Sequence, residues 1–279
     1  MKMNEFEKLQ ETIDGIADNT MGNMTAEYKK ALNDSRDIIR EYADRYGTLE
    51  IEVLRQNGAF IEMQNRLAGV IETVRNQVPT LTINMLREVY TTSYNESLSI
   101  INAISDDRFE SLLTSEAIEE VIEQPINNLT ISQRLARNKR GTINDLLSTV
   151  ERGLREGKTY GEMSKIIQDR YEVDINSANR VVRTESHRVM EKSKADSMQD
   201  AVSQGATVYK YWLTAQDERV RTSHSQLGAK YDADNPIPVD EPFEINGMTA
   251  MQPSGFGIAS EDINCRCVAA YTTEGGENA

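Results

Sequence analysis

Hydrophobic residues recur at helical spacing through the first two-thirds of the chain. Apolar side chains return every three or four positions at Phe6, Leu9 and Ile13, and again between Tyr28 and Tyr46, with charged residues between them. This spacing places the apolar groups on one face of a helix and the charged groups on the other. The pattern therefore predicts long amphipathic helices in the N-terminal region.

Prolines and a capping threonine predict where these helices end and begin. Pro79 and Pro125 are expected to interrupt helices, because proline lacks the amide hydrogen and clashes with the preceding turn. Apolar residues share one helical face over residues 143–154, and Thr142 precedes them as an expected N-cap. A helix is therefore predicted from Thr142 to about Gly157.

A second capping signal follows directly. Thr159 and Glu162 have the Thr-x-x-Glu spacing of a capping box, in which each side chain binds the other residue's amide. This predicts a helix start at Thr159. A further, longer helix is predicted over residues 177–203, ending before Gly205.

The pattern changes to short alternating segments in the last quarter of the chain. Residues 207–213 are rich in β-branched and aromatic residues and predict a strand, and residues 267–272 predict another. Between them, residues 243–249 predict a β-hairpin, because Asn246 and Gly247 accept the positive φ angles of a type I′ turn.

These elements together predict a predominantly helical α+β protein. The expected organisation is a helical N-terminal region over residues 1–133, a module of helix and short antiparallel strands over 134–273, and a flexible tail over 274–279.

Charge is distributed unevenly. The chain has a net charge of −14, which argues against a surface that binds nucleic acid throughout. Residues 134–194 nevertheless carry 14 Lys or Arg against 9 Asp or Glu, a local net of +5. This basic segment predicts either a solvated helical face, or a contact with an acidic partner or with DNA. The sequence contains no apolar stretch of membrane-spanning length and no apolar leader, so we expect synthesis in the cytoplasm.

Four ordered segments carry a specific resemblance. Arg183-Thr184-Glu185 is followed by the run from Tyr211 to His224, then by Phe243 to Gly247, and finally by Ile263-Asn264-Cys265-Arg266-Cys267. In this order and spacing they closely resemble the phage Mu F-like head morphogenesis, or minor capsid, family. The resemblance covers roughly residues 140–272.

The resemblance implies a minor head protein of a tailed bacteriophage, present in few copies at the portal vertex. It implies a role in procapsid assembly and in genome packaging or delivery. The implied partners are the portal protein and the major capsid or scaffold protein, and the implied location is the head interior or portal vertex, after assembly in the host cytoplasm. The motif residues expected to build the assembly surface are Arg183, Glu185, Trp212, Asp217, Arg219, Arg221, His224, Asn264, Cys265, Arg266 and Cys267.

Two interpretations of the thiols remain open. Thiolate and imidazole groups suit zinc, so His224, Cys265 and Cys267 could bind it as a structural ion. The alternative is that the cysteines pack as small apolar groups and His224 hydrogen-bonds within the module. If zinc binds, candidates for the fourth ligand are Asp217, Glu218 and Asp262.

The other motif residues predict structural contacts. Asp217, Arg219 and Arg221 are expected on one face near the end of a strand, because side chains alternate there. An ion pair from Glu185 to Arg219, or from Asp217 to Arg183, would then hold the helix against the strands. The single tryptophan, Trp212, is expected at the centre of the module's core.

The sequence predicts no enzyme. It has two histidines, and it lacks the Gly-x-Ser-x-Gly, Walker and His-Glu-x-x-His motifs, so no catalytic residue is assigned. His187, on a polar helix face, is expected at the surface. Two rival functions remain: a DNA-binding protein ejected with the genome, and an ADP-ribosyltransferase-like or toxin-related enzyme.

Overall fold

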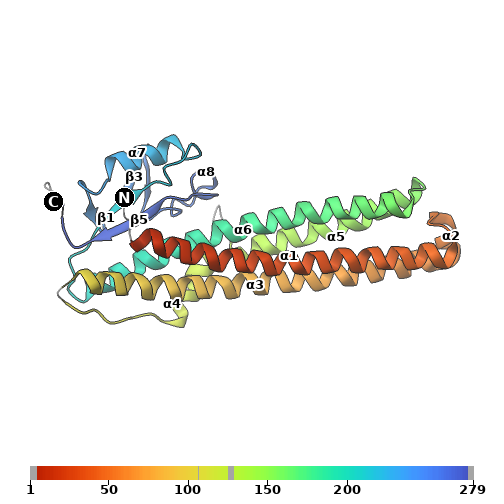
Figure 1. The fold of residues 1–279 in the computed structure, drawn as a ribbon, viewed down its shortest axis with the longest axis horizontal. Coiled ribbons are helices and arrows are strands. Elements are labelled where there is room, and N and C mark those ends of the chain that lie inside the picture. The colour runs from red at the N-terminus through yellow and green to blue at the C-terminus, as the bar shows by residue number, and fades with distance from the viewer. Residues whose placement is uncertain (1–4, 106, 125–128, 276–279) are drawn as a thin grey trace. The chain divides into compact units, whose positions relative to one another are not determined.

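The computed structural model describes residues 5–105, 107–124 and 129–275, with backbone only at residue 132 and residues 134–144. The chain is predominantly helical, with short antiparallel strands near its C-terminus, which confirms the predicted fold class (Figure 1). The predicted break at Pro125 and most of the predicted tail lie outside the described residues. The helices of the first 203 residues are α1 (Glu5–Tyr46), α2 (Ile51–Gln56), α3 (Ala59–Ile104), α4 (Ser115–Glu123), α5 (Ile131–Arg155) and α6 (Tyr160–Ser203).

The chain divides into two compact units, and three long helices contribute to both. Residues 1–18, 83–131 and 182–279 form the first unit, and residues 19–82 and 132–181 form the second. Among the described residues, no helix combines the length and the apolar character needed to cross a membrane.

The second unit is a bundle of antiparallel helices. Arg66 of α3 pairs with Glu41 of α1 at 2.8 Å, and further along the same helices Thr82 contacts Met24. Later residues of α3 therefore contact earlier residues of α1, so the two helices are antiparallel. The same reversal relates α1 to α6, where Ser35 lies 3.1 Å from the Tyr171 hydroxyl and Arg40 binds the Tyr160 hydroxyl at 3.0 Å. The buried residues of this bundle include Met24, Ile39, Tyr42, Leu67, Ile71, Val150, Leu154, Met163 and Ile167.

In the first unit α3 and α6 run parallel. The Ser193 hydroxyl donates to the Tyr90 carbonyl at 2.6 Å, and one turn further along both helices Ser197 donates to Tyr94 at 3.0 Å. The tyrosine side chains of α3 also bind α6. The Tyr90 hydroxyl donates to Asp196 at 2.7 Å, and the Tyr94 hydroxyl donates to Asp200. The spacing of four residues places each contact on the same face of both helices.

The strands complete the first unit. The strands β2 (Ile237–Pro238), β1 (Tyr209–Leu213) and β5 (Val268–Thr272) form an antiparallel sheet in that order, and β3 (Phe243–Ile245) and β4 (Met248–Ala250) form a separate hairpin. Asn246 and Gly247 have φ angles of 51° and 75°, which confirms the predicted turn. Two short helices, α7 (Thr222–Lys230) and α8 (Ala259–Asp262), lie between strands.

A buried ion pair of α6 faces β5. Glu191 and Lys194 are fully buried, 2.6 Å apart, and the second Glu191 oxygen accepts from the Ala269 amide at 2.9 Å. The Lys194 ammonium lies 5.5 Å from the centre of the Phe6 ring, and that ring packs edge-on against Tyr271. These contacts hold the start of α1 and the sheet edge on α6.

Three predicted helix boundaries are wrong. Pro79 lies inside α3, because buried Val78 and Thr82 continue the apolar face past it and packing outweighs the proline's cost of about 3 kcal/mol. The helix predicted from Thr142 begins instead at Ile131, which is fully buried.

The third error is the separate helix over residues 177–203. The capping box at Thr159 and Glu162 forms as predicted, with the Thr159 amide donating to Glu162 at 2.8 Å and the Glu162 amide donating to Thr159 at 3.3 Å. The helix it begins does not stop before residue 203, because buried residues continue at helical spacing through Tyr171, Ala178 and Val182.

Candidate functional site

A histidine and two cysteines lie close together in the core of the strand module, which is formed by the strands and short helices between Tyr209 and Thr272. His224 lies in the first turn of α7, and Cys265 and Cys267 precede β5. The Nδ1 atom of His224 lies 3.6 Å from the Cys265 sulfur and 3.3 Å from the Cys267 sulfur. All three side chains are buried, and their ligand atoms lie within 4.8 Å of one another. The two thiols are free.

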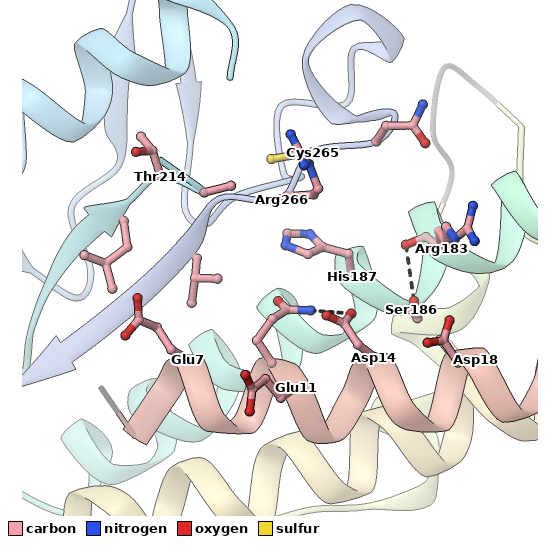
Figure 2. Close-up of a pocket in the computed structure, with 16 residues that line it drawn as sticks. Glu7, Glu11, Asp14, Asp18, Arg183, Ser186, His187, Thr214, Cys265 and Arg266 are labelled. Atoms are coloured by element: carbon pink, nitrogen blue, oxygen red, sulfur yellow. Dashed lines mark hydrogen bonds between the residues drawn. The ribbon is translucent and has the colours of Figure 1, made fainter. Parts of the chain in front are cut away.

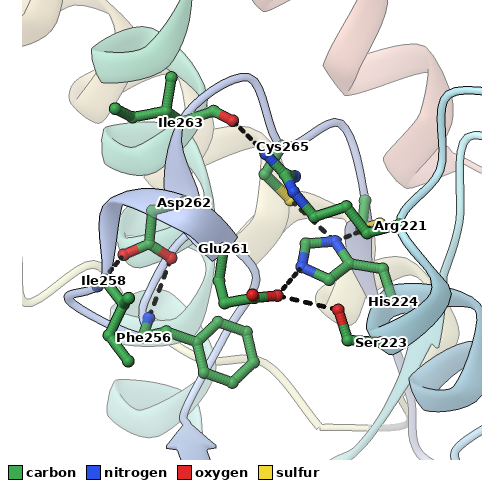
Figure 3. Close-up of polar contacts among 10 residues, drawn as sticks. Arg221, Ser223, His224, Phe256, Ile258, Glu261, Asp262, Ile263 and Cys265 are labelled. Carbon is green, nitrogen blue, oxygen red and sulfur yellow. Dashed lines mark hydrogen bonds and ion pairs between the residues drawn. The ribbon is translucent and has the colours of Figure 1, made fainter.

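The other ring nitrogen of His224 faces a carboxylate. Its Nε2 atom lies 3.2 Å from Glu261, whose carboxylate also accepts from the Ser223 hydroxyl at 2.9 Å (Figure 3). Next to this pair, the Arg221 guanidinium donates to the Ile263 carbonyl at 2.5 Å. Nε2 makes no hydrogen bond among the described residues, although the Glu261 carboxylate lies near it, and the opposite ring nitrogen is directed at the two sulfurs.

Aromatic rings enclose the cluster. The Trp212 ring packs edge-on against His224 and Phe243, with ring centres 5.5 and 5.1 Å apart. Phe256 stacks on the His224 ring at 6.2 Å. Trp212 is 1% exposed, at the centre of this small core. The surroundings exclude water from most of the cluster.

The two thiols differ in acidity. The pKa of Cys265 lies well below its ordinary value, chiefly because the Cys267 thiol hydrogen-bonds to it, with His224 adding to the effect. The pKa of Cys267 is raised, because its proton is held in that hydrogen bond and because burial disfavours a second thiolate. One thiolate thus forms readily, and the second needs a compensating positive charge.

A turn places both cysteines toward the histidine. Asn264 adopts a left-handed backbone, with φ 56°, which asparagine tolerates better than most residues. Between the cysteines, Arg266 extends the opposite way and binds Asp217 at 2.5 and 2.8 Å. Side chains two residues apart on extended backbone share a face, so Cys265 and Cys267 point the same way.

The expected carboxylate ligands lie elsewhere. Asp217 is bound by Arg266, and Glu218 is exposed. Asp262 is buried, and it accepts from the backbone amides of Phe256 and Ile258 at 3.1 and 3.0 Å. Burial raises its pKa. Among the described residues, the cluster therefore contains three ligand groups.

The predicted ion pairs are wrong. Glu185 pairs with Arg188 on its own helix at 2.9 Å, and Asp217 pairs with Arg266. Strand β1 ends at Leu213, and the chain then turns at Gln216, with φ 51°, so the predicted shared strand face does not exist. Of the expected motif residues, Arg183 is exposed, Arg219 is an exposed neighbour of Asp217 at 3.4 Å, and Arg221 immediately precedes α7.

Arg188 is the residue that sequence reasoning missed. Its side chain is 4% exposed, and besides Glu185 it donates to the carbonyls of Val121 and Ile122 at 2.9 and 3.2 Å. Those carbonyls lie in the last turn of α4, where backbone acceptors lack helical partners. The only local signal was the Glu-to-Arg spacing of three residues, which is common on exposed helices.

An open cavity of about 520 Å³ lies beside the cluster within the first unit (Figure 2). One wall carries acidic residues of α1, and the other contains Arg183, His187, Cys265 and Arg266. His187 is buried, which corrects its expected surface position: its Nδ1 atom lies 3.0 Å from the Ser254 hydroxyl. Its Nε2 atom has no hydrogen-bond partner among the described residues. The acidic lining residues are Glu7, Glu11, Asp14 and Asp18.

The basic segment 134–194 lies in α5 and α6, and the side chains of residues 134–144 lie outside the described residues. Several of its described cations already bind carboxylates of this chain. Arg170 pairs with Asp145 at 3.1 Å, for example. The other described pairs are Arg155 with Glu151, Lys158 with Glu156, Arg170 with Asp174, Arg188 with Glu185, Lys192 with Asp196, and Lys194 with Glu191.

Two known proteins are similar to this chain. Minor head protein GP7 of Bacillus phage SPP1 is 24% identical over 282 residues, which cover 96% of this chain and 87% of that protein. NAD(+)--arginine ADP-ribosyltransferase EFV of Enterococcus faecalis is 30% identical over 164 residues, which cover 59% of this chain but 33% of that protein. The chain thus spans about a third of the transferase. No solved structure matches.

The family comparison covers the module that contains the cluster. Residues 144–270 match the family described as Phage Mu protein F like protein. This range includes α7, the hairpin, His224 and both cysteines, and it agrees with the resemblance carried by the four motif segments. Through residues 144–270, the chain belongs to the phage Mu protein F like family.

Proposed function

We propose that this chain is a minor head protein of a tailed bacteriophage, which acts in procapsid assembly and in genome packaging or delivery. The observation that carries the proposal is the similarity to minor head protein GP7, because it extends over 96% of this chain and 87% of that protein. The family match over residues 144–270 supports the same conclusion. We further propose that the protein lies in the head interior or at the portal vertex of the virion. It would join the head while procapsids assemble in the host cytoplasm.

The geometry of the module supports a structural role. A hydrolase or transferase requires polar groups that converge on an accessible substrate. In this module, by contrast, the motif residues mostly bind one another. Arg266 binds Asp217 and the cysteines face His224, while Glu185 is held by Arg188 of its own helix. Such contacts build a rigid unit that presents its outer surface to a neighbour.

The open cavity of the first unit is the proposed contact surface. Glu11 and Asp18 are exposed on its α1 wall, and the field of four acids on that wall favours a basic segment of another head component. The portal protein is the proposed partner, with the major capsid or scaffold protein as further neighbours. The buried Nε2 atom of His187 offers one additional hydrogen bond to the incoming segment.

An amber mutation in the phage that encodes this chain tests the function. Without the chain, we expect procapsids with altered protein composition and reduced infectivity. Procapsids of normal composition and normal infectivity would exclude the proposal. A double charge reversal, Glu11→Lys with Asp18→Lys, tests the contact surface by co-purification with portal protein. The matched control reverses Glu88 and Glu96, which are exposed on α3 away from the cavity lining.

Enzymatic transfer of ADP-ribose to arginine is the second candidate, because one relative carries that name. The shared 164 residues leave two-thirds of that protein unmatched. We propose that the shared part is the Mu F-like module and that the transferase chemistry resides in the remainder. Incubation of the pure chain with labelled NAD and host lysate distinguishes the two, since labelled arginine residues in host proteins would favour the enzyme.

A contact with genomic DNA through residues 134–194 belongs to the proposal only as a secondary interaction. Carboxylates of this chain neutralise several of the described cations, which lowers the number available for phosphates. DNA affinity that falls steeply with salt would support the contact, because phosphate binding releases counterions. Negligible binding at low salt would remove DNA from the list of partners.

A further inference from the structure

We propose that His224, Cys265 and Cys267 bind one zinc ion, through the Nδ1 atom of the histidine and both thiolates. The ion would join α7 to the segment that leads into β5, 41 residues further along the chain for Cys265. This inference is independent of the proposed role in the phage head, because it rests on the geometry of the buried cluster alone.

The distances fit a tetrahedral ion. Zinc binds thiolate at about 2.3 Å and imidazole nitrogen at about 2.0 Å, so tetrahedral angles separate nitrogen and sulfur ligands by about 3.5 Å. The observed separations from Nδ1 are 3.3 Å to Cys267 and 3.6 Å to Cys265. The three ligand atoms are therefore placed as a bound ion requires, without movement of the backbone.

A metal ion uses the cluster more fully than hydrogen bonds do, because in the hydrogen-bonded form one thiol turns to the other sulfur. A neutral imidazole nitrogen has one lone pair, so it accepts one S–H proton, yet two sulfurs lie within reach of Nδ1. A metal ion satisfies all three atoms at once. Zinc also suits the donor set, because thiolate and imidazole are the ligands it prefers.

Glu261 supplies the second contact that a ligating histidine usually has. Its carboxylate lies 3.2 Å from Nε2 and is itself held by the Ser223 hydroxyl at 2.9 Å. The negative charge of Glu261 favours a proton on Nε2, which leaves Nδ1 unprotonated, the form that binds metal. The charge of Glu261 thus favours the tautomer that binds metal.

The backbone around Arg266 preorganises the two thiols. Cys-x-Cys spacing brings its sulfurs close together, and the bond from Arg266 to Asp217 keeps the intervening side chain on the opposite face. The described residues offer three ligands, and we assign the fourth position to a water molecule that enters from the open cavity, which Cys265 also lines.

Metal analysis of the full-length chain, purified under reducing conditions, tests the site directly. We expect about one zinc ion per chain, and an X-ray absorption spectrum with sulfur and nitrogen or oxygen in the zinc shell. His224→Phe and Cys267→Ser should lose the ion. His187→Phe is the matched control, because it removes the other buried histidine of the same unit and should keep the ion.

Two further variants separate ligation from folding. His224→Cys should retain zinc, since it replaces one ligand with another, whereas a purely packing role gives it no advantage over His224→Phe. Glu261→Gln should keep the fold by circular dichroism but weaken zinc affinity about 10- to 100-fold, as loss of an outer contact does. Wild-type protein that is well folded, lacks zinc and takes up none when dialysed against it would overturn the proposal. Phage assembly is measured separately, so either proposal can fail without the other.

Discussion

Arg266 donates two hydrogen bonds to the carboxylate of Asp217, at 2.5 and 2.8 Å. The two residues come from motif segments 49 positions apart, the tryptophan-containing run and the final Asn-Cys-Arg-Cys. The guanidinium lowers the pKa of Asp217 to about 2, and the Arg219 amide adds to the effect. The contact therefore joins the two segments wherever the carboxylate is ionised.

The first prediction concerns the acid limit of this contact. A carboxyl whose pKa is lowered by folding stabilises the protein when the pH is above its pKa in the unfolded chain. That stabilisation is lost as the pH falls through its pKa in the folded chain. Those values are 3.8 and about 2 for Asp217. Asp217→Asn should therefore lower the melting temperature slightly at neutral pH, and the difference from wild type should disappear between pH 4 and pH 2. Melting curves across this range provide the measurement.

The neighbouring exposed residue supplies the control. Glu218→Gln changes the same charge one position away without touching Arg266, and should leave the melting temperature unaltered. A difference between wild type and Asp217→Asn that stays constant from pH 7 to pH 2 would show that the ion pair does not cause it.

The second prediction concerns Arg188. Arg188→Met removes the guanidinium from beside the buried Glu185 carboxylate and from the carbonyls of Val121 and Ile122. Removing one member of a buried ion pair costs about 3–5 kcal/mol, because the remaining charge stays desolvated. We expect a loss of this size in the free energy of unfolding measured with urea.

A matched variant on the same helix tests the explanation. Arg183→Met removes an exposed arginine five residues earlier and should cost less than about 0.5 kcal/mol. Adding Glu185→Leu to Arg188→Met should recover part of the loss, because it removes the buried charge as well. Equal losses for the two arginine variants would contradict the prediction.

Local signals in the sequence were sufficient for most of the secondary structure. The turn at Asn246-Gly247 and the capping box at Thr159 act over a few residues, and both form as predicted. Helix ends were less predictable. Pro79 was expected to stop a helix that continues through it, because packing by distant residues decides that position and the local pattern does not contain it.

Pairings between distant residues were beyond sequence reasoning. Ion pairs were predicted from Glu185 to Arg219 or from Asp217 to Arg183, whereas Glu185 pairs with Arg188 and Asp217 with Arg266. Any carboxylate can pair with any nearby guanidinium, so partners follow from the fold. The thiol and imidazole cluster was easier to anticipate, because a chain with two cysteines and two histidines offers few combinations.

The third prediction concerns Lys210, which is buried under the hairpin. Its ammonium donates to the carbonyls of Val239 and Met251 at 2.9 and 2.8 Å, and lies 4.9 Å from the Phe243 ring centre. Burial lowers its pKa from 10.5 to about 8, although nearby Asp240 and Glu241 oppose the shift. The folded chain thus releases this proton more easily than the unfolded chain does.

Stability should consequently rise with pH through this window. Between pH 8 and pH 10.5 the unfolded chain binds more protons at Lys210, so the free energy of unfolding increases, by at most about 3 kcal/mol. Lys210→Met should lack this contribution, and the gap between wild type and variant in urea unfolding should widen with pH. Lys230→Met, which removes an exposed lysine of α7, should keep the wild-type rise. A gap that does not change with pH would exclude this role for Lys210.

The fourth prediction concerns the close approach of α7 to β1 at Gly228. A Cβ atom there would lie 2.9 Å from the Thr214 Cγ2 methyl and 3.7 Å from Trp212. Alanine normally favours a helix over glycine by about 1 kcal/mol. Gly228→Ala should nonetheless destabilise the protein by about 1–3 kcal/mol, because overpacking forces the helix away from the strand.

Removal of the opposing methyl group isolates the cause. Thr214→Ser deletes Cγ2, and the double variant Gly228→Ala with Thr214→Ser should regain most of the lost stability, since the new methyl group then occupies the vacated space. Urea unfolding of the four proteins in this double-mutant cycle measures the coupling. Additive losses, with no recovery in the double variant, would contradict the prediction. They would mean that Gly228 is needed for another reason and that the packing of α7 on β1 tolerates a larger side chain.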